Sequence, residues 1–385
     1  MIGLFNDSYL PVLDGVTLTV QNYAHCMHKK QQQVCVVTAK TPGYTDETPY
    51  PVFRYTSLPV LMRKPYRYGI PGVDRTLRKK LRQIPFSLVH VHSPFASARL
   101  ALEIANERNI PLIATFHSKY RDDFESIVRN KRLAEWMIKR IMPLYERADE
   151  VWIPQAAVEE TIRSYGYRGE VVVVDNGCDF NADPQNIRRF KQQARAGLRL
   201  EDGTPVFLFV GQHILEKNTQ LIIEALAAMK DQSFRMFFIG AGYAEKYLRT
   251  LTADRGLSSK VTFLGVVSDR ETLKQYYAAA DLLLFPSLYD NAPLVVREAS
   301  ALHTPAVLVK GSTAAEIITD NYNGFLIDNS VDALAERIRA LVQSPGTLRQ
   351  AGQCASRTIS RSWESVTEEV LLRYSQLQKR YAPRL

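Results

Sequence analysis

The chain alternates short apolar runs with longer segments of helical periodicity. In its first half, the runs expected to form strands are residues 2–5, 34–39, 87–92, 111–116, 150–154 and 170–175. Between them, Val16, Val20, Tyr23 and Met27 form one helical stripe, and residues 94–107 form a second helical segment. Apolar runs that alternate with helices are typical of βαβ units around a parallel sheet.

The same alternation starts again after a turn-rich stretch at residues 175–184. The strands expected there are residues 204–211, 234–240, 260–265, 281–286 and 304–309. We therefore expect an α/β protein of two doubly wound domains, residues 1–180 and 181–362, facing each other across a cleft. A final amphipathic helix over residues 363–381 is expected to pack back on the first domain.

Composition agrees with two globular domains, since 385 residues with 46% apolar content exceed what one core usually serves. The four cysteines, Cys26, Cys35, Cys178 and Cys354, are scattered, which argues against a disulfide framework or a zinc site and fits a reducing cytoplasm. The first residues lack a basic leader, and no run of about eighteen apolar residues occurs. We expect a cytoplasmic protein, either free or bound peripherally to the inner face of the membrane.

The net charge of +9 predicts attraction to an anionic partner. Residues 63–82 carry eight Lys or Arg residues against one acid, Asp74, and Val73, Leu77, Leu81 and Ile84 form an apolar stripe among them. Such a helix can lie on an anionic membrane surface, or it can be a solvated basic helix docked on its own sheet. No aromatic RNA-binding pattern appears, so no nucleic acid partner is expected.

Glycines and one lysine follow the first two strands of the second half. Gly211 ends a strand and Lys217 opens the next helix, an arrangement that suits a diphosphate, although a turn and a solvated helix start are the alternative. Gly240 and Gly242 form a glycine loop that can leave amides open to phosphate or sugar. Turn glycines explain this loop equally well, and the absence of a third glycine disfavours NAD.

The stretch after residues 281–286 is the most informative one. We expect a helix that starts at about Pro293 and is capped by Asn291, so that the amides of Ala292, Leu294 and Val295 form an anion site. Glu298 then reaches ribose hydroxyls, and Asp290 accepts hydrogen bonds from a sugar. Turn formers and a solvated helix residue are the alternative.

In combination these residues resemble the donor domain of retaining GT-B glycosyltransferases of family four, and the resemblance covers nearly the whole chain. It implies that Asp290 binds sugar hydroxyls, that Glu298 binds the ribose, and that Val266 and Val267 hold the nucleotide base. The segments YDNAPLVVREAS and KGSTAAE are most similar to bacterial members that glycosylate diacylglycerol, which implies a lipid acceptor.

The resemblance extends to the first half. Gly15 matches the loop that touches the donor phosphate, and His117 matches a histidine beside the transferred sugar, although a capped helix start and a loop-structuring histidine are the alternatives. His90 and His92 suggest a metal pair, but without a third ligand we interpret them as structural or acceptor-side groups.

The sequence departs from the family at two positions: Asp290 stands where Glu is usual, and Gln212 stands where Arg is usual. Since no D-x-D motif occurs, we expect neither a metal nor another cofactor. Lys217 and the helix amides would stabilise the leaving diphosphate. Retention would follow the family's front-face mechanism, in which a donor phosphate oxygen helps to deprotonate the acceptor hydroxyl.

The sequence thus predicts transfer of a hexose from a nucleotide-diphosphate sugar, for which we expect a UDP-sugar, to a lipid or glycan hydroxyl. The acceptor we favour is diacylglycerol at the membrane surface. The catalytic candidates are His117, Lys217 and Asp290. The alternatives are a GT-B sugar-nucleotide epimerase and a catalytically weak protein that only binds a nucleotide sugar.

Overall fold

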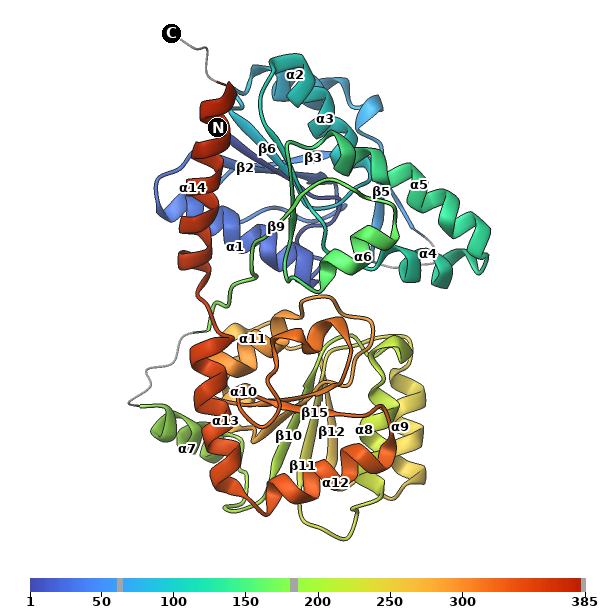
Figure 1. Cartoon of the computed structure of the whole chain (residues 1–385), viewed down its shortest axis with the longest axis vertical. Helices are drawn as coiled ribbons and strands as arrows, with labels where there is room; N and C mark the ends of the chain where they lie inside the picture. The colour runs from blue at the N-terminus through green and yellow to red at the C-terminus, as the bar shows by residue number, and fades with distance from the viewer. Residues whose placement is uncertain (61–64, 181–185, 382–385) are drawn as a thin grey trace. The chain divides into compact units, whose positions relative to one another are not determined.

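The chain forms two compact α/β units in a computed structural model that describes residues 1–60, 65–180 and 186–381. Unit 1 comprises residues 1–177 and the C-terminal segment from Trp363, and unit 2 runs from Cys178 to Ser362. The division falls three residues before the boundary that the sequence suggested, whose far side, residues 181–185, lies outside the described residues. Figure 1 shows the two units, coloured from blue to red along the chain.

Unit 1 is built on a seven-stranded parallel sheet with the order β3-β2-β1-β6-β7-β8-β9. Its strands are β1 Ile2–Phe5, β2 Val34–Ala39, β3 Val52–Tyr55, β6 Leu88–Val91, β7 Leu112–Thr115, β8 Glu150–Ile153 and β9 Val171–Val173. The central strands are buried at every position, because helices cover both faces of a parallel sheet. A small antiparallel pair, β4 Ser57–Pro59 and β5 Arg67–Gly69, stands apart from this sheet.

Helices flank the sheet of unit 1 on both sides (Figure 1). They are α1 Gly15–Lys29, α2 Arg75–Gln83, α3 Ala96–Arg108, α4 Tyr120–Val128, α5 Lys131–Arg147, α6 Val158–Ser164 and α14 Trp363–Tyr381, with a 3-10 turn η1 at Pro71–Val73. The last helix, α14, packs against α1 although more than three hundred residues separate them. The C-terminal end of the chain is therefore part of unit 1.

The basic helix α2 settles one choice that the sequence left open. Leu77 and Leu81 are buried in the core of unit 1, so its apolar stripe docks on the protein. The expectation that this stripe faces a bilayer is wrong for these two leucines. Arg78 and Arg82 form ion pairs with Glu103 and Glu107 of α3. Val73 remains 64% exposed, and Arg63 and Lys64 lie outside the described residues.

Unit 2 is built on a six-stranded parallel sheet with the order β12-β11-β10-β13-β14-β15. Its strands are β10 Val206–Val210, β11 Arg235–Ile239, β12 Val261–Gly265, β13 Leu282–Leu284, β14 Ala306–Val309 and β15 Phe325–Ile327. The helical elements are α7 Ile187–Gly197, η2 Leu215–Lys217, α8 Thr219–Ala227, α9 Glu245–Asp254, α10 Arg270–Ala279, α11 Leu294–Ala301, η3 Thr313–Ile317, α12 Val331–Val342 and α13 Pro345–Thr358. The strand order reverses between β10 and β13, and ligands of such sheets bind outside the carboxyl ends of the strands at this switch point.

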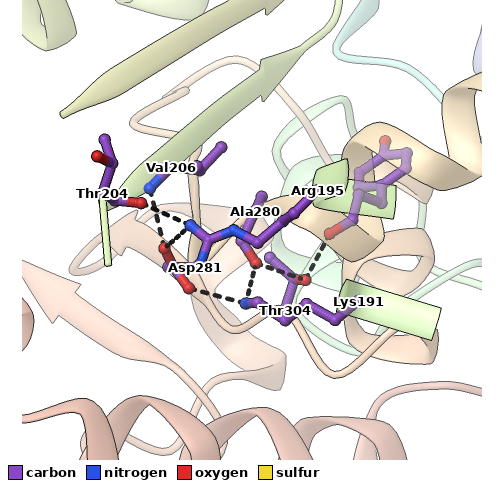
Figure 2. A network of polar contacts seen from close by, with 8 residues as sticks. Lys191, Arg195, Thr204, Val206, Ala280, Asp281 and Thr304 are labelled. Carbon is purple, nitrogen blue, oxygen red and sulfur yellow. Dashed lines mark hydrogen bonds and ion pairs between the residues drawn. The ribbon is translucent and has the colours of Figure 1, made fainter. Parts of the chain in front are cut away.

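The opposite, amino-terminal edge of this sheet is closed by a polar network (Figure 2). Asp281, just before β13, accepts hydrogen bonds from Lys191 and Arg195 of α7 and from the backbone N–H of Val206. Lys191 also donates to the carbonyl of Ala280 at 2.7 Å. The network joins α7 to the starts of β10 and β13, and its position away from the switch point marks it as structural.

The four cysteines, all of which the structure describes, form no disulfide framework, as their scattered positions in the sequence predicted. All four cysteines are free thiols, and burial raises the pKa of Cys35 to about 12. Across the described residues, none of the helices combines the length and the hydropathy that crossing a bilayer requires.

Candidate active site

The loops after β10 and β13 bring a lysine and an aspartate together at the switch point of unit 2. The Lys217 ammonium donates a hydrogen bond to the Asp290 carboxylate. Lys217 is only 8% exposed, so its charge needs this partner to remain buried. Two residues that lie 73 positions apart in the sequence thus form an ion pair.

Two aromatic rings lie near the Lys217 ammonium. Its Nζ atom lies 5.6 Å from the ring centre of Phe285 and 5.5 Å from that of Tyr289. Such rings attract a cation with their electron-rich faces. Lys217 ends the 3-10 turn η2 and does not open a helix as expected, since α8 begins at Thr219. The lysine is therefore held by side-chain contacts that fix its position at the strand ends.

The loop from Ser287 to Pro293 leads from β13 into α11. The Ser287 hydroxyl accepts hydrogen bonds from the N–H groups of Tyr289 and Asp290, which sets the course of the loop. Helix α11 begins at Leu294, and its N-cap residue is Pro293, which makes no side-chain capping bond. The prediction that Asn291 caps this helix is wrong, because proline takes the capping position.

The start of this helix offers N–H groups that can bind an anion. The first N–H groups of a helix have no acceptor within the helix, and here they belong to Leu294 and Val295. No side chain at the N-cap occupies them. An anion bound there would also gain from the positive end of the helix dipole. Ala292 precedes the helix, and its predicted part in the anion site stays a prediction.

Glu298 is buried inside α11 and already has two partners. Its carboxylate accepts hydrogen bonds from Arg270 and from the Tyr277 hydroxyl, each at 2.6 Å. Arg270 also binds Asp179. A carboxylate has about four lone-pair sites, so Glu298 can still accept a bond from a ribose hydroxyl. That role stays a prediction, and the structure adds that Arg270 and Tyr277 fix the carboxylate.

The glycines at the ends of β10 and β11 allow two loops to pack against each other. A Cβ atom on Gly240 would meet the carbonyl oxygen of Gly211 at 1.9 Å, and one on Gly242 would meet that of His213 at 2.3 Å. Gly240 also has φ +132°, and Gly211 has φ +152°. These contacts support the structural explanation for Gly240 and Gly242, and a direct ligand contact stays a prediction.

Apolar and aromatic side chains are exposed at the ends of the neighbouring strands. Val266 follows β12 and is 63% exposed, while Val267 is half-buried. Tyr243, which follows the glycine loop, is also exposed, and its hydroxyl donates to Glu216 at 2.5 Å. Exposed apolar side chains in the loops that follow the strands are suited to contact a nucleotide base.

In unit 1, the loop after β1 is held by a half-buried carboxylate. Asp7 accepts hydrogen bonds from the N–H and the hydroxyl of Ser97 and from the Tyr55 hydroxyl. Burial raises the pKa of Asp7, and these hydrogen bonds oppose that shift. Asp14 caps α1 by accepting from the N–H of Thr17 at 2.7 Å. These contacts fix the path of the loop that carries Gly15.

Gly15 itself is open to solvent. It is the first residue of α1, and a Cβ atom added there would meet no atom within 4 Å. The backbone therefore does not require glycine at this position for packing. An open space beside a helix start is consistent with the predicted approach of a phosphate, which stays a prediction.

Three histidines cluster at the carboxyl ends of β6 and β7. His117 Nε2 lies 3.1 Å from His92 Nδ1, and the rings of His90 and His92 are 4.1 Å apart. Burial lowers the pKa of His117 to about 3 and the pKa values of His90 and His92 well below 6.5, so all three are neutral at pH 7.

Both ring nitrogens of His90 are hydrogen-bonded within the protein. Its two ring nitrogens bond to the Tyr374 hydroxyl of α14 at 2.6 Å and to the Thr115 hydroxyl at 2.7 Å. The suggestion of a metal pair at His90 and His92 therefore fails, because His90 has no free nitrogen to ligate. Within residues 1–60, 65–180 and 186–381, no three His, Cys, Asp or Glu side chains are grouped so that they could hold a metal ion.

Two family profiles match the chain and together span most of it. Residues 13–182 match glycosyltransferase family 4, and residues 190–358 match the glycosyl transferases group 1. The chain belongs to these glycosyltransferases. The first match covers most of unit 1 without its C-terminal helix α14, and the second lies within unit 2.

Relatives and solved structures agree with this assignment. The glycosyltransferase is 24% identical over 349 residues to the alpha-monoglucosyldiacylglycerol synthase of Streptococcus pneumoniae, covering 89% of this chain and 79% of the relative. It is 23% identical to the enzyme of the same name from Acholeplasma laidlawii, covering 92% of each.

Among solved structures, sucrose-phosphate synthase from Thermosynechococcus elongatus has a TM-score of 0.78 at 20% identity, covering 98% of this chain and 99% of that one. HepE from Anabaena, in complex with UDP and glucose, has a TM-score of 0.75 at 19% identity, covering 97% and 99%. At this identity the likeness establishes the fold, which is GT-B.

Sequence reasoning placed the carboxylates of this glycosyltransferase but missed their partners. Arg270 and Tyr277 of α10 position Glu298, and Tyr243 stands at the exposed glycine loop. The sequence signal for Arg270 was weak, because it is one of 49 Lys or Arg residues. Gln212 is exposed.

Proposed function

We propose that the chain transfers a hexose from a nucleotide-diphosphate sugar to a hydroxyl group of a lipid. The donor we favour is a UDP-sugar, and the acceptor we favour is diacylglycerol. The observation that carries the proposal is the Lys217–Asp290 pair, which lies at the switch point of unit 2 in the loops after β10 and β13. It provides one cation for a diphosphate and one carboxylate for a sugar.

The proposed chemistry uses charge that is already in place. When the bond between the anomeric carbon and the diphosphate breaks, negative charge grows on the leaving group. Lys217 and the N–H groups of Leu294 and Val295 would stabilise that charge, a contribution of about 3 kcal/mol for one well-placed donor. Asp290 would exchange its bond to Lys217 for bonds to the sugar hydroxyls. Glu298 would hold the ribose, and Val266 and Val267 would contact the base.

Unit 1 would contribute neutral groups. His117, whose pKa burial lowers to about 3, can donate or accept a hydrogen bond at neutral pH without adding charge beside the sugar. Gly15 would let the donor phosphate approach the start of α1. We further propose retention of the anomeric configuration. We also propose activity without a metal, since Lys217 and the helix amides can stabilise the negative charge of the leaving diphosphate that a divalent ion would otherwise neutralise.

The acceptor follows from the names of the relatives. Two relatives that match about nine-tenths of this chain are alpha-monoglucosyldiacylglycerol synthases. A family likeness at this identity favours a lipid acceptor and leaves a glycan as the second candidate. A third relative, the sulfoquinovosyl transferase of Arabidopsis thaliana, is 24% identical and matches 96% of this chain, and its name also describes transfer of a sugar.

Two other functions make different predictions. A sugar-nucleotide epimerase would consume the donor without an acceptor, and none of the relatives named above is an epimerase. A catalytically weak protein would bind the donor without turnover, as the loss of an arginine at Gln212 suggests. Both alternatives are separated from transfer by measuring donor consumption with and without diacylglycerol.

The first test is donor binding. Thermal unfolding of the full chain is measured with UDP-, GDP- and ADP-sugars, for the wild type and for Glu298→Ala. We expect a UDP-sugar to raise the wild-type midpoint and to raise that of Glu298→Ala less. If no nucleotide sugar stabilises the wild type, the proposal fails.

The second test is transfer. The donor found in the first test is incubated with diacylglycerol in mixed micelles, and the glycolipid is analysed by NMR for the anomeric configuration. We expect a product with the configuration of the donor and an unchanged rate in EDTA. An inverted product, or a rate abolished by EDTA and restored by a divalent metal, would contradict the corresponding part of the proposal.

A further inference from the structure

Helix α5 has an exposed apolar surface that unit 1 does not cover. Leu133 is 44% exposed and Trp136 is 54% exposed, although the other two tryptophans, Trp152 and Trp363, are buried. The opposite side of the helix is buried in the core and comprises Ala134, Ile138, Ile141, Met142 and Tyr145. The exposed apolar residues are therefore not needed to attach the helix to its own unit.

Basic side chains surround these apolar residues. Helix α5 carries five Lys or Arg residues and two Glu residues. One of the two acids, Glu135, is paired with Arg121 of α4. We call the surface formed by Arg132, Leu133, Trp136, Lys139 and Arg140 the α5 face.

The charges of the α5 face are not neutralised within the protein. No ion pair in the described part of the chain involves its three basic residues, which are exposed. The Arg140 guanidinium lies 5.2 Å from the ring centre of Trp136, so cation and ring occupy the same surface. The α5 face thus combines a tryptophan, a leucine and three unpaired cations.

We propose that the α5 face docks on an anionic lipid bilayer. Tryptophan favours the boundary between headgroups and acyl chains, because its ring is apolar while its N–H can stay hydrated. Long Lys and Arg side chains keep their charges at the anionic headgroups while their stems lie along the apolar surface. The inference rests on the proposed lipid acceptor, because docking would bring unit 1 to the surface where that acceptor is found.

Helix α2 provides a matched comparison within the same unit. It also carries five Lys or Arg residues, but its two leucines are buried. The exposed apolar side chain beside it is the small Val73, which precedes the helix, so α2 offers cations without a large apolar anchor. If net charge alone drew the protein to membranes, the two helices would contribute alike. If docking needs an apolar anchor among cations, α5 should dominate.

The first test is flotation of the full chain with vesicles of phosphatidylcholine alone and of phosphatidylcholine with phosphatidylglycerol. It needs no donor or acceptor, so it can fail while transfer succeeds, and the reverse also holds. We expect binding to anionic vesicles only. Replacing Arg132, Lys139 and Arg140 by Gln should weaken it about a hundredfold. The matched α2 variant, with Arg75, Lys79 and Lys80 replaced by Gln, removes the same charge and should weaken it less than tenfold.

The second test uses tryptophan emission. Since Trp136 is the exposed tryptophan, anionic vesicles should shift the wild-type emission to shorter wavelength and protect it from an aqueous quencher. The variant Trp136→Phe should lose both changes. Leu133→Ser combined with Trp136→Ser should abolish flotation while circular dichroism stays unchanged.

Four results would overturn the proposal. They are absence of binding to anionic vesicles, equal loss in the α2 and α5 charge variants, vesicle binding that leaves Trp136 accessible to the quencher, and self-association of the chain that Trp136→Ser removes. The last result would assign the α5 face to a second copy of this chain.

Discussion

The carboxyl edges of the two sheets handle buried polar groups in different ways. In unit 1 the edge holds three histidines that burial keeps neutral, with His92 and His117 bonded to each other. In unit 2 the edge holds opposite charges in contact, Lys217 with Asp290 and Arg270 with Glu298. Beside β6 and β7, unit 1 thus has a histidine cluster that is neutral at pH 7, called the neutral edge below, whereas unit 2 has a charged edge.

The difference follows from the cost of burial. A histidine can lose its proton and avoid the cost of a buried charge, whereas a lysine beside an aspartate keeps its charge because the partner compensates. A charged edge can meet a diphosphate, and a neutral edge can meet sugar hydroxyls. Under the proposed function, the two units would therefore have different chemical tasks.

The strongest test of the charged edge replaces its lysine. Lys217→Met should lower kcat/KM for transfer about 100- to 1000-fold, because one donor to the leaving diphosphate is lost. The matched control is Lys191→Met, since Lys191 also binds an aspartate, Asp281, at the opposite edge of the same sheet. The control should lower the unfolding midpoint but leave kcat/KM of the folded protein close to wild type. Equal losses of activity in both variants would show that the lysine at the carboxyl edge of this sheet has no special role in transfer compared with the lysine at its amino-terminal edge.

The second prediction concerns backbone packing at the two edges. Gly240→Ala should lower the free energy of unfolding by about 3 kcal/mol, because the new Cβ would overlap the Gly211 carbonyl oxygen. Gly15→Ala should change it by less than about 0.5 kcal/mol, because a Cβ there meets no atom. Urea unfolding checks both values. A tolerated alanine at Gly240 would show that the loops after β10 and β11 can separate.

The third prediction uses pH and tests the neutral edge. The unfolded chain binds protons at its histidines as the pH falls below about 6.5, whereas the folded chain resists protonation of His117 until about pH 3. Stability should therefore fall as the pH is lowered from 7 to 5, by about 2 kcal/mol for each histidine that stays neutral.

The contribution of one histidine is isolated by a variant. Burial raises the pKa values of Asp7 and Asp14, which acts in the opposite direction over this range. The difference between wild type and His117→Asn cancels those terms. The variant should lose about 2 kcal/mol less than wild type between pH 7 and pH 5, measured by urea unfolding. An identical pH dependence in the two proteins would show that His117 accepts a proton in the folded state.

The smallest expected effect comes from Gln212. Gln212→Arg restores the guanidinium that the family usually has and should lower the KM for the donor about fivefold, roughly 1 kcal/mol. Gln353→Arg adds the same charge on an exposed site of α13 and should leave KM unchanged. Steady-state kinetics with both variants decide whether position 212 contacts the donor or whether added charge alone raises affinity.

The sequence predicted most of the strands because buried parallel strands are continuous apolar runs. It missed β3 and β15, which lie at the edges of their sheets, and the pair β4 and β5, which stands apart from the large sheets. The residues of β3 and β4 are mostly half-buried or exposed, so these strands are not continuous buried apolar runs. It recognised the amphipathic character of α2 but could not show what buries its leucines. That information depends on the tertiary position of the helix and not on its periodicity.

The candidate site was predictable where a residue follows a strand and unpredictable where its partner is distant. Lys217 and Asp290 each stand in a loop after a strand, so both were predicted as candidates, but their contact across 73 positions was not predicted. Arg270 lies on a different helix from Glu298 and carries no local motif. Asn291 was assigned as a cap from residue type alone, and Pro293 occupies that position instead.

The return of α14 to unit 1 has a consequence for the order in which the protein is made. Tyr374, the partner of His90, leaves the ribosome only after all residues of unit 2 have been synthesised. Unit 2 is continuous in the chain and can fold as soon as it emerges, whereas unit 1 waits for its last helix. Until then Trp152 lacks the stacked ring of Tyr374, and the histidine cluster lacks its hydrogen bond. The domain that begins the chain is therefore the last to be completed.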